Sequence, residues 1–123
     1  MKTKMTAILA LMVAGFAAPT QAADSIVSWT NATQYEDGTP LGTNLKGTRV
    51  EVGTCVASAF GVKSGELFAT APAATVTFTG QGFGQWCFRA FTQTQSGLES
   101  VASNVATKTI AEPKPKAPVI SVN

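Results

Sequence analysis

The chain has 123 residues, a length that suits one domain. Its 9 basic and 7 acidic side chains give a net charge of +2, but Lys2 and Lys4 stand at the very start, so residues 23–123 carry seven charges of each sign. Because no basic stripe is left to follow phosphates, we expect no nucleic-acid partner. Histidine is absent and two cysteines cannot complete a zinc shell, so we expect no metal site.

The first 22 residues have the order of a secretory signal peptide. Lys2 and Lys4 precede the uncharged apolar run Met5–Ala18, and the next four residues end with small side chains at the last and third-last positions. A membrane anchor is the competing interpretation, but this run is short for a bilayer that needs ~20 residues. We expect cleavage after Ala22, a secreted, periplasmic or surface location, and no stable membrane span afterwards.

Cys55 and Cys87 are the whole thiol content of the chain. In an exported protein an even number of cysteines points to a disulfide. We therefore expect these two residues to be joined.

The following segments favour short β-strands. Apolar and polar side chains alternate at period two, and Gly, Pro, Asn and Asp separate the alternating stretches. In chain order the expected strands are Ile26–Thr30, Gly47–Gly53, the weaker Gly65–Thr70, Ala74–Thr79, Gln85–Thr94 and Asn104–Ile110. Short strands with polar turns are typical of an all-β sandwich. The residues expected in its core are Trp29, Val50, Trp86 and Phe88.

The composition changes after Ile110. Residues 111–118 are rich in proline and lysine, a composition that favours extended polyproline II geometry. Val119–Val122 then has the character of one more short strand. The expected organisation is a signal peptide over residues 1–22, a β-sandwich over 23–110, and a linker with an extra or donated strand over 111–123.

Motifs along the chain have the order and spacing of a known family. They are Ser28-Trp29-Thr30, Asp37-Gly38-Thr39-Pro40-Leu41, Leu45-Lys46-Gly47, Gln85-Trp86-Cys87-Phe88-Arg89-Ala90 and Gly97-Leu98-Glu99-Ser100. Together they resemble a fibronectin type III domain, in the variety common in bacterial exported proteins and phage structural proteins. The resemblance implies an immunoglobulin-like β-sandwich of about seven short strands. Such a scaffold hosts many unrelated tasks, so it implies the fold far better than the function.

Two details of the family bear on this chain. Its sixth strand usually begins with tyrosine where Trp86 stands, so a corner bond to the backbone must use the indole N–H here. Its third and sixth strands are antiparallel neighbours, which brings Cys55 at the end of one beside Cys87 at the start of the other. A bridge there closes a loop of ~30 residues and stabilises the fold by roughly 3 kcal/mol in the chain-entropy model.

Members of the family usually open with a strand ahead of the tryptophan strand. Cleavage after Ala22 would leave three residues before Ile26, so we expect this first strand to be missing and the edge of the Trp29 strand to be unpaired. The segment Lys116–Val122 looks like such a first strand. One hypothesis is that Val119–Val122 supplies this strand to the next subunit in a head-to-tail assembly, with Val119 and Ile120 as its binding residues. The competing interpretations are pairing within the same chain, capping of another edge, and disorder.

No residue pattern points to catalysis. The adjacent carboxylates Glu36 and Asp37 suit a turn, and the glycine-rich stretch Gly80–Gly84 lacks the Lys-Ser/Thr of a phosphate loop. No serine or cysteine has a nearby base, and a disulfide would consume both thiols. We expect neither an enzyme nor a cofactor.

Three aromatic side chains are candidates for binding: Phe91, which has outward parity on its strand, Phe83 in the glycine-rich loop, and Tyr35 beside the Asp-Gly turn. Cover by Arg49, Arg89 or a neighbouring loop is the competing interpretation for Phe91. The loop 31–44 suits polar or carbohydrate contacts, and it equally suits a plain connection.

The sequence thus predicts an exported, non-enzymatic module for protein interaction or structural assembly, at a cell surface or in a virion. Its expected partner is another copy of itself or another surface or virion component. Adhesion through the sandwich-end loops, to a glycan for example, is the alternative. The C-terminal segment distinguishes the two functions, because an assembly subunit needs it and a simple adhesin does not.

Overall fold

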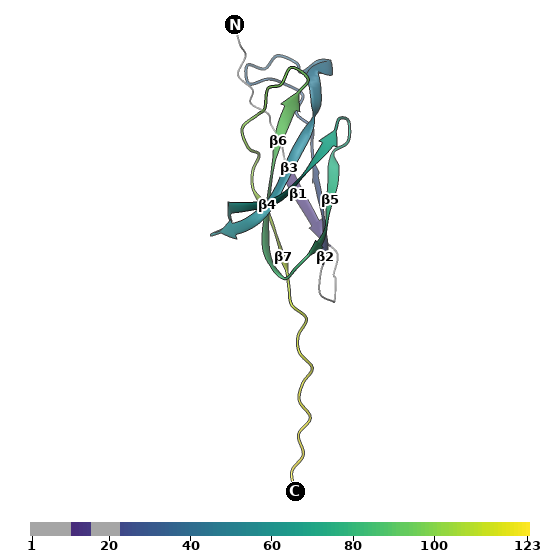
Figure 1. Ribbon diagram of the computed structural model, residues 1–123, viewed down its shortest axis with the longest axis vertical. Helices are drawn as coiled ribbons and strands as arrows, with labels where there is room; N and C mark the ends of the chain where they lie inside the picture. The colour runs from purple at the N-terminus through teal and green to yellow at the C-terminus, as the bar shows by residue number, and fades with distance from the viewer. Residues whose placement is uncertain (1–10, 16–22) are drawn as a thin grey trace.

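The structure is a computed structural model that describes residues 11–15 and 23–123. Two antiparallel sheets pack face to face (Figure 1). One sheet has the order β1-β2-β5 and the other the order β4-β3-β6-β7. The first is built from β1 (Leu11–Gly15), β2 (Ala23–Trp29) and β5 (Thr75–Gln81); the second from β3 (Leu45–Val56), β4 (Ala59–Thr70), β6 (Gly84–Thr94) and β7 (Ala106–Ile110). The predicted all-β sandwich is confirmed, with a short 3-10 turn at Gly42–Asn44 ahead of β3.

The six strands expected between residues 26 and 110 are all present. Two of them are much longer than expected: β3 runs three residues past its expected end, and β4 begins six residues before its expected start. β4 begins at Ala59 because β3 and β4 form one long hairpin whose two turn residues, Ala57 and Ser58, have φ of 51° and 67°. Tight hairpin turns need positive φ at both positions and usually use Asn or Gly there. The turn was not predicted from the sequence because alanine and serine are not typical of these positions.

The core lies between the two sheets and is formed by alternate residues of the strands. Val27 and Trp29 of β2 face the core, and the Phe78 and Phe88 rings meet there with centroids 5.8 Å apart. Trp86 is half-buried at the rim, where its indole N–H donates to the Gly82 carbonyl at 2.9 Å, the corner bond expected of it. Burial of each large apolar side chain contributes about 1.5–3 kcal/mol to folding.

The disulfide joins β3 to β6 within one sheet. The Cα atoms of Cys55 and Cys87 lie 5.3 Å apart, and Cys87 is fully buried despite its outward parity. The register pairs Gly53 with Cys87, so the end of β3 and the start of β6 are neighbours as the resemblance implies.

Candidate functional site

The strand β1 occupies the outer edge of β2. Its five residues pair antiparallel with Ser25–Trp29, so that positions 11, 13 and 15 stand opposite Trp29, Val27 and Ser25. β1 also contacts β7, and it therefore lies at the seam between the two sheets. The vacancy expected at this edge is filled in the full chain, because residues 11–15 supply the strand. Those residues fall inside the range 1–22 that the sequence predicts as a signal peptide, and the rest of that range lies outside the described residues.

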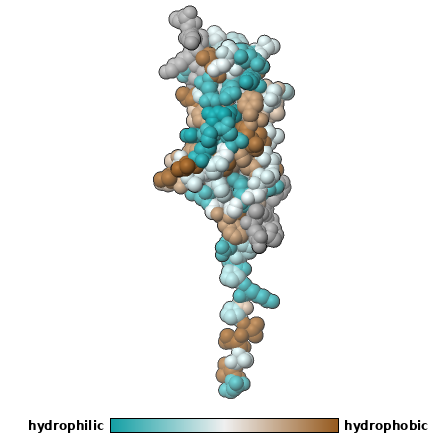
Figure 2. Space-filling model, viewed as in Figure 1, coloured by the Kyte–Doolittle hydropathy of each residue, from teal (hydrophilic) through white to brown (hydrophobic). Residues whose placement is uncertain are grey.

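The C-terminal segment, residues 111–123, is exposed along its whole length and forms no strand. It leaves the sandwich at the end of β7 and extends along the long axis of the molecule (Figure 1). The side chains of Val119, Ile120 and Val122 are 95%, 83% and 90% exposed, and Figure 2 shows them as an apolar group near the chain end. The strand expected over Val119–Val122 is absent from the single chain because no sheet edge lies beside it to accept its backbone hydrogen bonds.

Phe91 lies on the outer face of the β4-β3-β6-β7 sheet, and two guanidinium groups cover it. The central carbon of Arg49 is 4.3 Å from the centre of the Phe91 ring, and that of Arg89 is 5.4 Å from it. Arg89 also lies 4.1 Å from the Phe60 ring on β4. The geometry therefore favours the alternative in which Arg49 and Arg89 cover Phe91, because the stacked guanidinium groups occupy the face of its ring.

A carboxylate network holds these two arginines in place. Glu51 is 5% exposed and accepts a hydrogen bond from Arg89 Nε at 2.7 Å and another from Arg49. Glu99 accepts from Arg49 Nε and Nη2 at 3.0 and 2.9 Å. These charged side chains therefore hold one another in place on the outer face of the sheet.

The ion pairs shift the pKa values of the groups involved. Burial alone would raise the pKa of Glu51, but the hydrogen bonds from Arg89 and Arg49 outweigh it and hold that pKa below its ordinary value. The hydrogen bond from Arg49 lowers the pKa of Glu99, and the same bond raises the pKa of Arg49. Glu51, Glu99 and Arg49 therefore stay charged near neutral pH.

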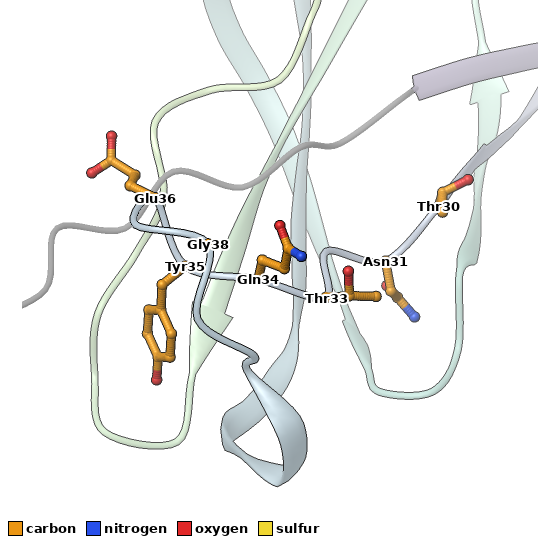
Figure 3. Close-up of a pocket in the computed structure, with 7 residues that line it drawn as sticks. All are labelled: Thr30, Asn31, Thr33, Gln34, Tyr35, Glu36 and Gly38. Carbon is orange, nitrogen blue, oxygen red and sulfur yellow. The ribbon is translucent and has the colours of Figure 1, made fainter.

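A pocket of about 290 Å³ lies in the loop after β2. All of its described lining residues come from one stretch of that loop, as Figure 3 shows. Tyr35 packs against the small apolar cluster of Ala32 and Leu41 beneath the loop, and its hydroxyl accepts a hydrogen bond from Asn44. The ring therefore anchors the loop. The lining residues are Thr30, Asn31, Thr33, Gln34, Tyr35, Glu36 and Gly38.

The structure does not bring the five predicted binding residues together. Phe83 is 40% exposed in the connection between β5 and β6, at the end of the sandwich opposite the loop of Tyr35. Sequence reasoning missed the exposed apolar tip of the β3–β4 hairpin, where Val56 and Val62 are 66% and 73% exposed. A sequence signal for this tip would have required recognition of the turn at residues 57 and 58.

Within residues 11–15 and 23–123, no cluster of three or more carboxylate or cysteine side chains could hold a metal ion. Over the same residues, no helix is long and apolar enough to cross a membrane.

Comparison with known proteins bears on the fold. A scan against protein-family models and a search of curated proteins gave no match. Among solved structures, the chain is similar to the third fibronectin III domain of human KIAA0343 protein, with a TM-score of 0.59, 14% identity, and 97% of this chain and 91% of that chain covered. It is also similar to the fibronectin type III domain of human fibronectin type III domain containing protein 3, with a TM-score of 0.56, 13% identity and 93% of each chain covered. This chain therefore has the fibronectin type III fold, as the motifs in its sequence implied.

Proposed function

We propose that this protein is an exported β-sandwich module that works through protein interaction, as a structural or assembly subunit at a cell surface or in a virion. Residues 1–22 act as its signal peptide and are removed after Ala22. The disulfide and the fold are typical of extracellular proteins, and domains of this fold commonly mediate protein interactions. The module is non-enzymatic, a proposal supported by the engagement of Glu51 and Glu99 in ion pairs with the arginines of the sheet face.

The observation that carries this proposal is the exposed C-terminal segment. Three aliphatic side chains stand 83% or more exposed at the end of a proline-rich linker. Exposed apolar residues gathered on one short segment mark an interaction site, because water disfavours them unless a partner covers them.

Glycan adhesion stays a prediction with weaker support. A sugar-binding loop usually presents an exposed aromatic face, whereas Tyr35 is half-buried and packs against Ala32 and Leu41. The residues that line the loop pocket are mostly polar in type, a composition that any plain loop would share.

Export is tested by expressing the untagged full chain in a bacterium with an oxidising periplasm and measuring intact masses in each fraction. We expect a periplasmic or extracellular product that begins at Ala23 and carries the mass deficit of one disulfide. The control is Ala22→Arg, which should block processing because signal peptidase needs a small side chain there. A cytoplasmic product that retains Met1 and two free thiols would contradict the proposal.

A further inference from the structure

We propose that residues 118–122 of one mature copy occupy the β1 position on β2 of the next copy, so that mature chains join head to tail. This inference rests on the proposed export, because removal of residues 1–22 takes β1 away from β2. It names the partner of the exposed C-terminal segment as a second copy of the same chain.

The β1 position is an acceptor built to hold a five-residue strand. In the full chain, each residue of Ser25–Trp29 is paired with one residue of β1. When β1 is cleaved off, this stretch of β2 has backbone N–H and C=O groups without a ladder partner, and the seam toward β7 opens. An uncovered strand edge of this kind recruits another strand.

The C-terminal segment has the right pattern to fill this position. In the register of β1, Pro118, Ile120 and Val122 stand opposite Trp29, Val27 and Ser25. Directly opposite residues of an antiparallel pair share one face, so the two aliphatic side chains of that set point toward the core. Val119 and Ser121 then point outward, opposite Ser28 and Ile26.

The proline does not prevent this pairing. In the proposed register Pro118 is the first residue of the donated strand, and that strand lies at the edge of its sheet. Proline is tolerated at both kinds of position because a missing N–H there costs no ladder bond.

The direction of the chain favours donation to another copy. β1 ends beside Ser25, near the start of β2, and β7 ends at the same pole, because Lys108 donates to the Asp24 carbonyl and Ile110 pairs with Gly84. β7 and β1 thus run the same way, toward the lower end of the sandwich in Figure 1. A segment that continues straight on from β7 therefore enters the β1 position of a copy placed beyond that end with the correct polarity.

Pairing within one chain would need a full reversal. The segment leaves at the lower end, so it would have to climb the length of β2 and turn back before it could run antiparallel to that strand. The linker 111–117 holds two prolines, which stiffen it in an extended form. At ~3.1 Å per residue this linker spans about 22 Å, enough to separate two sandwiches and too little to climb one and turn.

The decisive experiment uses the exported, processed protein with Ser28→Cys and Val119→Cys together. These positions stand opposite each other in the proposed register, and the ~4.5–5.5 Å Cα spacing of such pairs lies within the range of a disulfide. We expect a ladder of covalent multimers on a non-reducing gel that collapses to one band on reduction. The matched control combines Val119→Cys with Thr77→Cys, an exposed residue of β5 that lies one strand further from the β1 position.

The alternative outcomes overturn the inference in distinct ways. An internally linked monomer would show pairing within the chain, a product that stops at dimers would show reciprocal exchange, and an equal ladder from the Thr77→Cys control would show unspecific contact. A protein that keeps Met1 would overturn the proposed export as well as this inference. A product that begins at Ala23 and gives no ladder would overturn the inference alone.

A second variant avoids new thiols. Ile120→Asp changes one exposed side chain outside the sandwich, so its circular dichroism should match that of the parent protein. We expect light scattering after size exclusion to show multimers for the parent and monomers for Ile120→Asp at the same concentration. Equal masses for the two proteins would contradict the inference.

Discussion

Glu51 has an environment unlike that expected of a charged residue on the outer face of a strand. Its parity points outward, yet its side chain is buried beneath the guanidinium groups of Arg49 and Arg89. A buried carboxylate is stable only when its oxygens are paired, and breaking such a pair leaves charge without a partner. Glu51 therefore links the two arginines of the sheet face, and Glu99 holds Arg49 as well.

Glu51→Gln is expected to lower the free energy of unfolding by about 2 kcal/mol at pH 7, because it removes charge-assisted hydrogen bonds to both arginines. The pKa of Glu51 is lower in the folded chain than in the unfolded one, so its stabilising contribution is complete above the ordinary glutamate pKa and is lost as pH falls through the folded value. The difference between parent and variant should therefore shrink below about pH 4.3, the ordinary glutamate value.

Urea unfolding of both proteins at a series of pH values measures this difference. The control is Glu36→Gln, which removes an exposed loop carboxylate and should leave stability at pH 7 within about 0.5 kcal/mol of the parent protein. A constant difference between the parent protein and Glu51→Gln from pH 7 to pH 3 would contradict the role given to the ion pairs.

At the scale of single residues, the sequence predicted which face of the sheet a side chain points to better than it predicted how exposed that side chain is. Alternation correctly placed Val50 and Phe88 in the core. It did not predict that Glu51 and Cys87 would be buried, although both have outward parity. The long side chains of Arg49 and Arg89 cover Glu51, and Cys87 lies beside Ala59, at the start of a strand that follows a turn without glycine. Cover of this kind depends on neighbouring strands, which no local pattern records.

The β3–β4 hairpin shapes the second sheet, and at Gly53, where its register is irregular, the two strands approach closely. A Cβ atom at Gly53 would lie 2.3 Å from the Val62 carbonyl oxygen, a backbone atom that cannot move without the strand. A Cβ atom at Gly82 would meet nothing within 4 Å.

Gly53→Ala is therefore expected to destabilise the fold by about 2 kcal/mol through a forced backbone shift, whereas Gly82→Ala should change stability by about 0.5 kcal/mol or less. Thermal unfolding with the disulfide intact compares the two variants under one condition. Equal melting temperatures for the two variants would show that the hairpin backbone shifts to fit the added Cβ atom without loss of stability.

Elements were predictable where turn chemistry was conventional. The strands β2, β5, β6 and β7 are bounded by Gly, Pro, Asn or Asp and were found within a few residues of their observed ends. β1 was not expected as a strand because an apolar, uncharged run reads as an export signal. The same run also suits a buried edge, and periodicity cannot separate the two uses.

At the scale of the whole molecule, two segments of one chain suit a single position. The five residues of β1 hold it in the full chain, and residues 118–122 have a matching pattern and direction. If β1 is removed during export, the chain carries an open acceptor at one end and a spare strand at the other. Stability of the mature protein then becomes a property of the assembly, since a partner that binds only the folded state stabilises it by mass action.

The melting temperature of the processed protein should consequently rise with concentration. A tenfold increase in partner concentration is worth at most ~1.4 kcal/mol, which corresponds to a rise of at most about 7 °C for a domain of this size. Scanning calorimetry across two decades of concentration measures the slope. Ile120→Asp should abolish it, and Lys114→Ala, which changes the linker and leaves the donated strand intact, should retain it. A flat dependence in the parent protein would mean that each mature sandwich is stable without its neighbour, and the exposed segment would then need another partner.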